Sequence, residues 1–212
     1  MFSIAETIAR HHRIAFEFSG GRDSTAALYL MRPFWSRMAV YHLDTGDQFP
    51  EVRRVVDLVG RDVNILRVGT DVKAARDEHG LPSDIVPFDN TTVGRVLSGR
   101  TIKIVDRMEC CSRSVMHPLH DRVMRDGTTL IVRGYRADEF KGQHAFTSGW
   151  TDGRIELLHP IEGWSAERVM KYLHAHKLPV ADFYEHGAQQ APECMGCTAW
   201  WDEGRTAYMR KL

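Results

Sequence analysis

The sequence predicts an α/β fold in which helices flank a parallel sheet. Two observations support this prediction. In the first half of the chain, short runs of β-branched and aromatic residues alternate with helical patterns, which is how strands joined by crossover helices appear in a sequence. The first run also leads through a turn with two glycines, at residues 19–24, directly into a helical segment. Right-handed crossovers then place helices on both faces of the sheet.

Strands and helices are predicted in alternation along the chain. We expect buried strands at residues 14–18, 38–43, 63–68 and 128–132. Pro50 suits the first turn of a helix after the second strand, and Ser165 is the expected N-cap of a helix that reaches residue 176. Further helices are expected at residues 1–13, 24–31 and about 115–125. We place no element at residues 80–108, and we expect a flexible segment at residues 187–192.

Length and composition limit the class of protein. A chain of 212 residues fits one domain, which we expect to span residues 1–212 and to end in a Cys-x-x-Cys segment at about 190–212. Positive and negative side chains number 28 each, so no net charge draws the chain to nucleic acid or to an anionic membrane. The sequence contains no apolar run of about 18 residues and no apolar centre of a secretory signal. We therefore expect a cytoplasmic protein without a membrane partner.

The glycine turn after the first strand is a candidate anion site. It reads Ser19-Gly20-Gly21-Arg22-Asp23-Ser24. Two glycines let the backbone approach an anion closely, while the amides of the loop and of the first helical turn point toward phosphate or sulfate oxygens. The hydroxyls of Ser19 and Ser24 can add further donors. The alternative is an ordinary strand-to-helix turn with a Ser or Asp cap.

Two other loops are expected at the same edge of the sheet. Asp44, Thr45 and Gly46 follow the second strand, and Gly134 and Arg136 follow the fourth. Ligands of open α/β sheets lie beyond the carboxyl ends of the strands, so these loops and the glycine turn should face one crevice. A guanidinium group suits phosphate or sulfate because its planar donors carry a permanent charge. Arg133 and Lys141 are possible additions to this site.

The four cysteines occur in two tight pairs. Cys110 is followed by Cys111, and Cys194 is separated from Cys197 by two residues. In a reducing compartment such pairs favour metal ligation over disulfides. A shared site requires the fold to bring together two pairs that are roughly eighty residues apart.

These motifs together resemble the PP-loop superfamily (adenine nucleotide α-hydrolase-like), and within it the adenylyl-sulfate and phosphoadenylyl-sulfate reductases. The glycine turn matches SGGxDS at every specified position, and no Walker lysine follows it. Residues 44–51 resemble DTGxxFPE, residues 134–139 resemble GxRRxE with Ala137 in place of the second arginine, and residues 158–165 and 176–179 resemble LxPIxxWT and HxLP. The resemblance covers about residues 13–200. It implies an adenine nucleotide at the glycine turn, with Arg136 on its charged end.

The cysteine spacing is similar to that of the cluster-binding adenylyl-sulfate reductases. In that family a CC pair and a later CxxCT sequence hold a [4Fe–4S] cluster, which implies Cys110, Cys111, Cys194 and Cys197 as ligands here. A structural zinc also accepts four thiolates, and unligated buried thiols are a further alternative.

The chain departs from the reductases in two places. It lacks the additional cysteine near the C-terminus that attacks the sulfate sulfur, so a reaction by thiolate attack needs an external thiol. After Cys111 the reductases carry a basic pair, and this chain has Ser114 and Val115 instead. Lys103 and Arg107 are candidates to replace the missing charge.

Three functions follow from these observations. The first is a reductase-like enzyme of sulfur metabolism that acts on adenylyl sulfate or its 3′-phosphorylated form, with a thiol from a thioredoxin-like partner. The second is an ATP pyrophosphatase that activates a target for sulfur insertion, related to DNA phosphorothioation, in which Mg²⁺ neutralises the triphosphate with Asp23 or Asp44 as ligand. The third is a nucleotide-binding scaffold without catalysis. No catalytic residue is assigned, and Asp23 and Arg136 are the candidates.

Overall fold

A five-stranded parallel sheet forms the centre of the computed structural model, which describes residues 3–85, 91–99, 103–140, 147–189, 193–199 and 203–211. The strand order is β3-β2-β1-β6-β7, and each neighbouring pair is parallel. The strands are β1 (Ile14–Glu17), β2 (Met38–Asp44), β3 (Ile65–Gly69), β6 (Leu130–Arg133) and β7 (Glu156–Leu158). The chain leaves β1 toward β2 on one side and later returns to β6 on the other. The order therefore reverses at β1, and ligands of open α/β sheets bind beside such a point.

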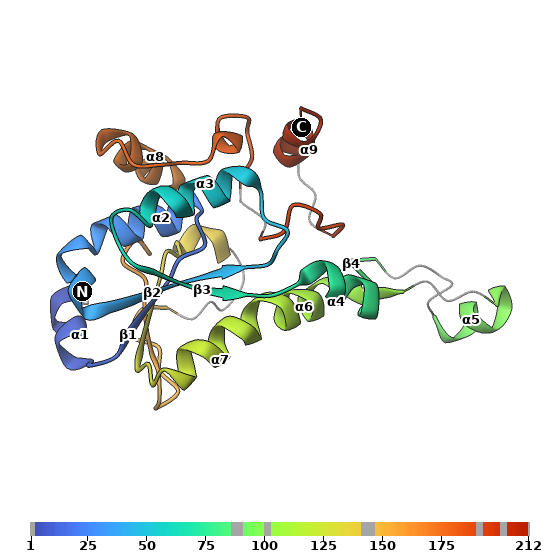
Figure 1. Ribbon diagram of the computed structural model, residues 1–212, viewed down its shortest axis with the longest axis horizontal. Coiled ribbons are helices and arrows are strands. Elements are labelled where there is room, and N and C mark those ends of the chain that lie inside the picture. The colour runs from blue at the N-terminus through green and yellow to red at the C-terminus, as the bar shows by residue number, and fades with distance from the viewer. Residues whose placement is uncertain are drawn as a thin grey trace.

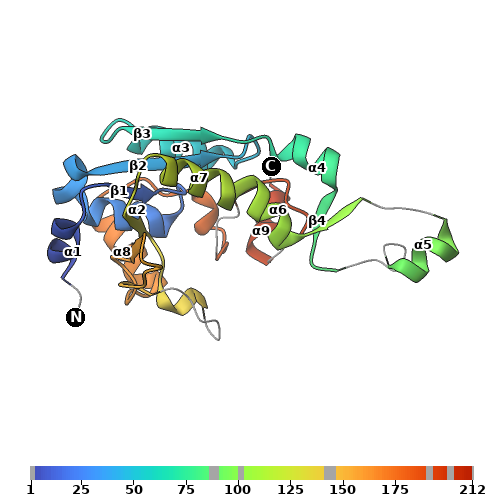
Figure 2. The same ribbon diagram turned by 90° about the horizontal axis from the view of Figure 1, so that it is seen from below.

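Helices cover both faces of this sheet, as the sequence predicts. One face packs against α2 (Arg22–Leu30), α3 (Pro50–Val59) and α8 (Ala166–Ala175), and the other against α7 (His117–Arg125), as Figures 1 and 2 show. Successive strand residues alternate between the two layers, because Phe16 and Val132 lie in the first core and Ala15 and Ile131 in the second. The helix α1 (Ile4–Arg10) joins the first core through Ile8.

The segment between β3 and α7 extends away from the sheet. It contains α4 (Val72–His79), β4 (Leu81–Ser83), α5 (Thr92–Ser98), β5 (Ile104–Asp106), α6 (Arg107–Cys111) and a π-helical turn (Ser112–Met116). In both ribbon views α5 lies at the far tip of this extension (Figures 1 and 2). Within this extension, β4 and β5, each of three residues, form a small parallel sheet of their own. No periodic pattern marks this region in the sequence, because elements so short carry too few residues for a period to be read.

Short elements complete the described chain. They are the 3-10 helices Arg32–Arg37, Ala137–Phe140 and Asp182–Tyr184 and the C-terminal helix α9 (Glu203–Met209). In the described ranges, no helix has both the length and the apolar character needed to cross a membrane. The predicted flexible segment at residues 187–192 and the candidate Lys141 lie partly or wholly outside the described residues.

Candidate functional site

The glycine turn joins β1 to α2 by a close approach of backbone to α3. Gly20 has φ +81°, and a Cβ atom on it would lie 2.9 Å from Cγ1 of Val52 and 3.0 Å from Cγ2 of Val56. Gly21 is the N-cap of α2 and gives the helix no side-chain cap. The amide of Gly21 donates to the hydroxyl of Ser19 at 3.3 Å, but the N-cap itself has no side chain to accept from the amides that follow it. A helix N-terminus of this kind suits an anion as a partner.

Hydroxyl groups fix the shape of the turn from inside. The Oγ atoms of Ser19 and Ser24 lie 3.0 Å apart, and the hydroxyl of Ser24 lies 3.0 Å from the carbonyl oxygen of Gly21, to which it can donate. The backbone N–H of Arg22 donates to the hydroxyl of Tyr184 at 3.3 Å, and the Arg22 guanidinium stacks over the Tyr184 ring. Ser19 and Asp23 remain partly exposed. Tyr184 carried no signal in the sequence.

The loop after β6 meets the glycine turn directly. A Cβ atom on Gly134 would lie 2.6 Å from the backbone N and Cα of Ser24, so only glycine permits this contact. Arg136 follows two residues later, and its side chain is 4% exposed. The structure therefore places Gly134 and Arg136 beside the glycine turn. Arg133 lies at the end of the same strand and pairs with Glu17 on β1 at 2.5 Å.

Three carboxylates surround the Arg136 guanidinium. Its Nε lies 2.6 Å from Asp23 Oδ1, its Nη1 2.5 Å from Asp138 Oδ1 and its Nη2 3.2 Å from Glu139 Oε1. Burial, and then the charge of Asp23, raises the pKa of Glu139. One guanidinium does not neutralise three carboxylates, although Arg22 also contacts Asp23 at 3.4 Å. Excess negative charge at this point would favour a phosphate ligand that brings its own cation.

The loop after β2 connects the glycine-turn side of the site with the C-terminal cysteines. The backbone N–H of Gly46 donates to Asp44 Oδ1 at 2.9 Å, and the buried Thr45 hydroxyl donates to the carbonyl of Glu193 at 3.2 Å. Glu193 directly precedes Cys194, and burial raises its pKa to about 7.

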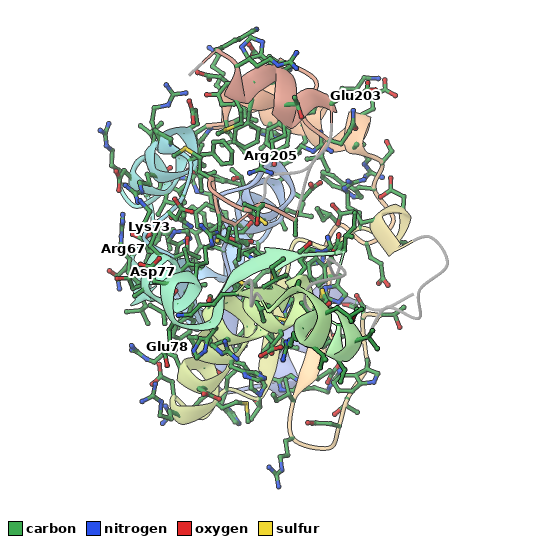
Figure 3. The ribbon with its side chains drawn as sticks, turned by 90° about the vertical axis from the view of Figure 1, so that its right-hand side faces the viewer. Arg67, Lys73, Asp77, Glu78, Glu203 and Arg205 are labelled. Atoms are coloured by element: carbon green, nitrogen blue, oxygen red, sulfur yellow. The ribbon has the colours of Figure 1, made fainter. Side chains whose placement is uncertain are left out.

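The Cys194–Cys197 loop is held by two groups from distant elements. Asp47 Oδ2 accepts the backbone N–H of Gly196 at 3.0 Å, and the Asp47 carbonyl accepts that of Met195 at 2.6 Å. On the other side, Arg205 of α9 donates to the carbonyls of Met195 and Cys197 at 2.6 and 2.9 Å. Figure 3 shows Arg205 directed from α9 toward the interior of the molecule. Arg205 also carried no sequence signal, because it reads as an ordinary helical charge.

The two cysteine pairs meet in space. Cys110 and Cys194 are buried in one cluster with Val72 and Val105, and Cys197 packs against it. Cys111 follows Cys110 in the chain, and burial, then the charges of Cys110 and Cys197, raises its pKa to about 11. The fold thus gathers thiols from segments that are far apart in sequence.

Donor type and surroundings at this cluster fit a thiolate centre. In the part of the chain that the structure describes, no three His, Cys, Asp or Glu side chains form a ready metal site. Two buried donors near this cluster, the Nε of Arg76 and the hydroxyl of Ser114, have no hydrogen-bond partner among the described residues. Both side chains lower the pKa of Cys110 against the effect of burial. Such donors stabilise sulfur that carries negative charge.

Comparison with known proteins gives three kinds of match. The family model described as "Phosphoadenosine phosphosulfate reductase domain" matches residues 13–200. Sulfate adenylyltransferase subunit 2 of Azospirillum brasilense is 24% identical over 231 residues, which covers 95% of this chain and 70% of that protein. Among solved structures, a phosphoadenylyl-sulfate (PAPS) reductase from Candida auris in complex with phosphate superposes with a TM-score of 0.56 at 12% identity, over 84% of this chain and 80% of the other.

Two further solved structures share the fold. Candida glabrata FMN adenylyltransferase in complex with ATP has a TM-score of 0.52 at 18% identity, over 84% of this chain and 52% of that one. NH3-dependent NAD synthetase from Campylobacter jejuni has a TM-score of 0.53 at 12% identity, over 82% and 68% of the two chains. At such identities the likeness establishes the fold alone.

Proposed function

Since the chain belongs to the phosphoadenosine phosphosulfate reductase domain family and has a PP-loop fold, we propose that it binds an adenylated nucleotide and reduces or transfers its sulfur group with an external thiol. The substrate would be adenylyl sulfate or its 3′-phosphorylated form. One observation supports the proposal: the N-terminus of α2, whose N-cap Gly21 has no side chain, lies at the point where Gly134 brings Arg136 against the turn. That arrangement provides backbone amides for the charged end of the nucleotide. The Arg136 guanidinium lies beside them and is paired with Asp23, Asp138 and Glu139.

The residues of this chain would bind and orient the substrate. The amides of the turn and the hydroxyl of Ser19 would hold the phosphate next to the sulfate, and the Asp44–Gly46 backbone would line the opposite side of the crevice. An external thiolate would then attack the sulfate sulfur, and the sulfur–oxygen bond would break as the nucleotide leaves with the electron pair. The leaving nucleotide is AMP from adenylyl sulfate and adenosine 3′,5′-bisphosphate from the 3′-phosphorylated form. A second thiol would release sulfite and form a disulfide. A thioredoxin-like protein is the partner we expect, because all four cysteines of the chain belong to the cluster described above.

We further propose that Cys110, Cys111, Cys194 and Cys197 hold a [4Fe–4S] cluster, with zinc as the alternative metal. Four thiols at one place and the donors around Cys110 support this proposal. A bound cluster would place its charge close to the anion site and would tune the electrostatics there.

The second candidate function is an ATP pyrophosphatase that activates a target, such as a nucleic acid, for sulfur insertion. The carboxylates of Asp23, Asp138 and Glu139 around a single guanidinium favour it, because a triphosphate arrives with Mg²⁺ and the reductase substrate does not need a metal. Asp23 and Asp44 would be the residues nearest to that cation. The missing fifth cysteine agrees with this reaction as well.

Product analysis separates the candidates. The anaerobically purified chain is titrated with ATP, adenylyl sulfate and its 3′-phosphorylated form, and then incubated with each of them in the presence of thioredoxin and reductant. We expect sulfite from one of the two sulfated nucleotides, together with AMP from adenylyl sulfate or adenosine 3′,5′-bisphosphate from its 3′-phosphorylated form. Pyrophosphate from ATP with Mg²⁺ would select the second candidate. Binding without any product would indicate a scaffold, and no binding of any adenine nucleotide would refute the proposal.

A further inference from the structure

A buried guanidinium lies next to the cysteine cluster. Arg76 belongs to α4, and its side chain is 9% exposed. Its Nη1 lies 2.7 Å from Oδ2 of Asp47, whose side chain is 4% exposed. The guanidinium lowers the pKa of the Cys110 thiol against the effect of burial, and it interacts electrostatically with Cys194. One cation is therefore shared between the two cysteine pairs.

Other basic residues near the first cysteine pair are directed elsewhere. Arg113 pairs with Glu109 at 2.6 Å and is partly exposed. Lys103, which the sequence offered as a substitute charge, donates to the backbone carbonyl of Asp77 at 3.0 Å. Arg107, the other candidate, pairs with Asp84 at 2.9 Å, and its effect on Cys111 is smaller than that of the neighbouring thiols. Ser114 occupies a position where the resembling reductases carry a basic residue.

The Asp47–Arg76 pair also packs against the second cysteine pair. A Cβ atom on Gly196 would lie 2.9 Å from Asp47 Oδ2 and 3.1 Å from Arg76 Nη1. Gly196 therefore leaves room for the ion pair inside the Cys194–Cys197 loop. Because Asp47 accepts the N–H of Gly196 with the same oxygen that holds Arg76, one carboxylate fixes both the loop and the guanidinium.

We propose that Arg76 is the positioning residue that supplies positive charge to the cysteine cluster, in place of the basic residue missing after Cys111. Asp47 holds it in this position. The inference rests on the proposed metal centre and is independent of which nucleotide is the substrate. A guanidinium beside thiolates stabilises their negative charge through N–H···S contacts, so it strengthens metal binding and favours the more negative, reduced state of an iron–sulfur centre.

The test compares Arg76→Gln and Arg76→Lys with wild type in the full chain, purified without oxygen. Metal and sulfide per chain, the visible spectrum, the midpoint potential and the rate of metal loss to a chelator are measured. We expect Arg76→Gln to lose metal faster, on the order of tenfold, and any iron centre to have a lower potential. Arg76→Lys keeps the charge and should restore part of both properties.

A matched control comes from the same helix. Lys73 also faces Asp47, at 3.9 Å, but its side chain is 68% exposed and lies at the edge of the molecule in Figure 3. Lys73→Gln removes one positive charge from α4 and should match wild type. Circular dichroism and the unfolding midpoint of each metal-free variant show whether Arg76→Gln still folds, and if it does not, the comparison of Arg76→Lys with wild type decides.

Two results would overturn the inference. The first is a wild-type chain that binds no metal, and the second is a folded Arg76→Gln variant with the metal retention and potential of wild type. Nucleotide affinity is measured on the same samples, and we expect it to be unchanged in Arg76→Gln. If wild type bound no adenine nucleotide, the proposed function would be refuted. The role of Arg76 would still be tested by the metal measurements.

Discussion

Several close contacts of the site form only because a glycine, which has no Cβ atom, occupies the position. Gly20 allows the turn to lie on α3, Gly134 allows the end of β6 to touch the first turn of α2, and Gly196 leaves room for an ion pair. At each position a methyl group would meet backbone or buried side-chain atoms at about 2.6 to 2.9 Å. The geometry of the site therefore depends on the absence of side chains as much as on the charged groups.

We predict that Gly134→Ala weakens nucleotide binding and destabilises the fold by roughly 1–3 kcal/mol, the usual cost of forcing extra volume into a packed contact. The new methyl would lie 2.6 Å from the Ser24 backbone and would push the glycine turn away from Arg136. Calorimetric titration and urea unfolding measure the two effects. Gly163→Ala is the control, because a Cβ atom on Gly163 would have no other atom within 4 Å. Equal behaviour of the two variants would contradict the assigned contact.

His42 gives a second prediction at this scale. Its ring is buried between the carbonyl of Phe18 and the side chain of Gln48, and burial lowers its pKa below the ordinary value of 6.5. Below pH 6.5 the unfolded chain therefore binds a proton that the folded chain does not, so stability falls with pH until the lowered pKa is reached. We expect His42→Gln to lose part of the stability difference between pH 7.5 and pH 5.5. Urea midpoints test this, with the same substitution at exposed His174 as control. An undiminished difference in His42→Gln would count against it.

At the scale of elements, the sequence predicted the strands and helices that are long enough to show a periodic pattern of apolar residues. The strands β1, β2, β3 and β6 and the helices α2, α3, α7 and α8 lie within a few residues of their predicted positions. The missed strand β7 has three residues and depends on its pairing with β6. The two strands of the extension that carries α5 were missed for the same reason, because each also has only three residues.

Three loops of the site could be predicted from the sequence, whereas two of its arginines could not. The glycine turn, the loop after β2 and the loop after β6 follow from strand order, because carboxyl ends of parallel strands share one edge. Arg76 and Arg205 could not be found this way. Both look like helical surface charges, and only tertiary contacts with Asp47 and with the carbonyls of Met195 and Cys197 give them a role.

The cap of α8 provides a prediction for an element. The Ser165 hydroxyl accepts the backbone N–H of Arg168 at 3.2 Å, and α8 packs on the sheet through Val169 and Leu173. Ser165→Ala should lower the free energy of unfolding by about 1 kcal/mol, because a backbone donor loses its partner. Glu167→Gln on the same turn removes only an exposed ion pair with Lys171 and should change stability less. Chemical denaturation of both variants checks the order.

At the scale of the whole molecule, the last helix is fastened to the first half of the chain. Tyr208 of α9 is buried against Phe49 and Phe183, and its hydroxyl donates to Glu51 on α3. The same helix carries Arg205, which holds the cysteine loop. Packing of α9 and the shape of the cysteine site are therefore coupled.

We predict that Tyr208→Ala costs roughly 3 kcal/mol, as for other buried aromatic rings, and loosens the cysteine loop. Tyr208→Phe keeps the ring and loses only the hydrogen bond to Glu51, so about 1 kcal/mol is expected. Urea unfolding gives the energies, and the rate at which a thiol reagent modifies Cys197 reports on the loop. If alanine and phenylalanine had the same effect, ring packing would not be what fastens α9.

The hydrogen bond between Asp47 and Gly196 joins positions 149 residues apart. Contacts of such high order form late, after the intervening strands have found their places, because a long loop must be closed before they bring any gain. Until then the two cysteine pairs stand apart as unprotected thiols on a partly folded chain, and the adjacent sulfurs are open to oxidation. The yield of correctly assembled protein should therefore depend on reductant during refolding far more than the stability of the finished molecule does.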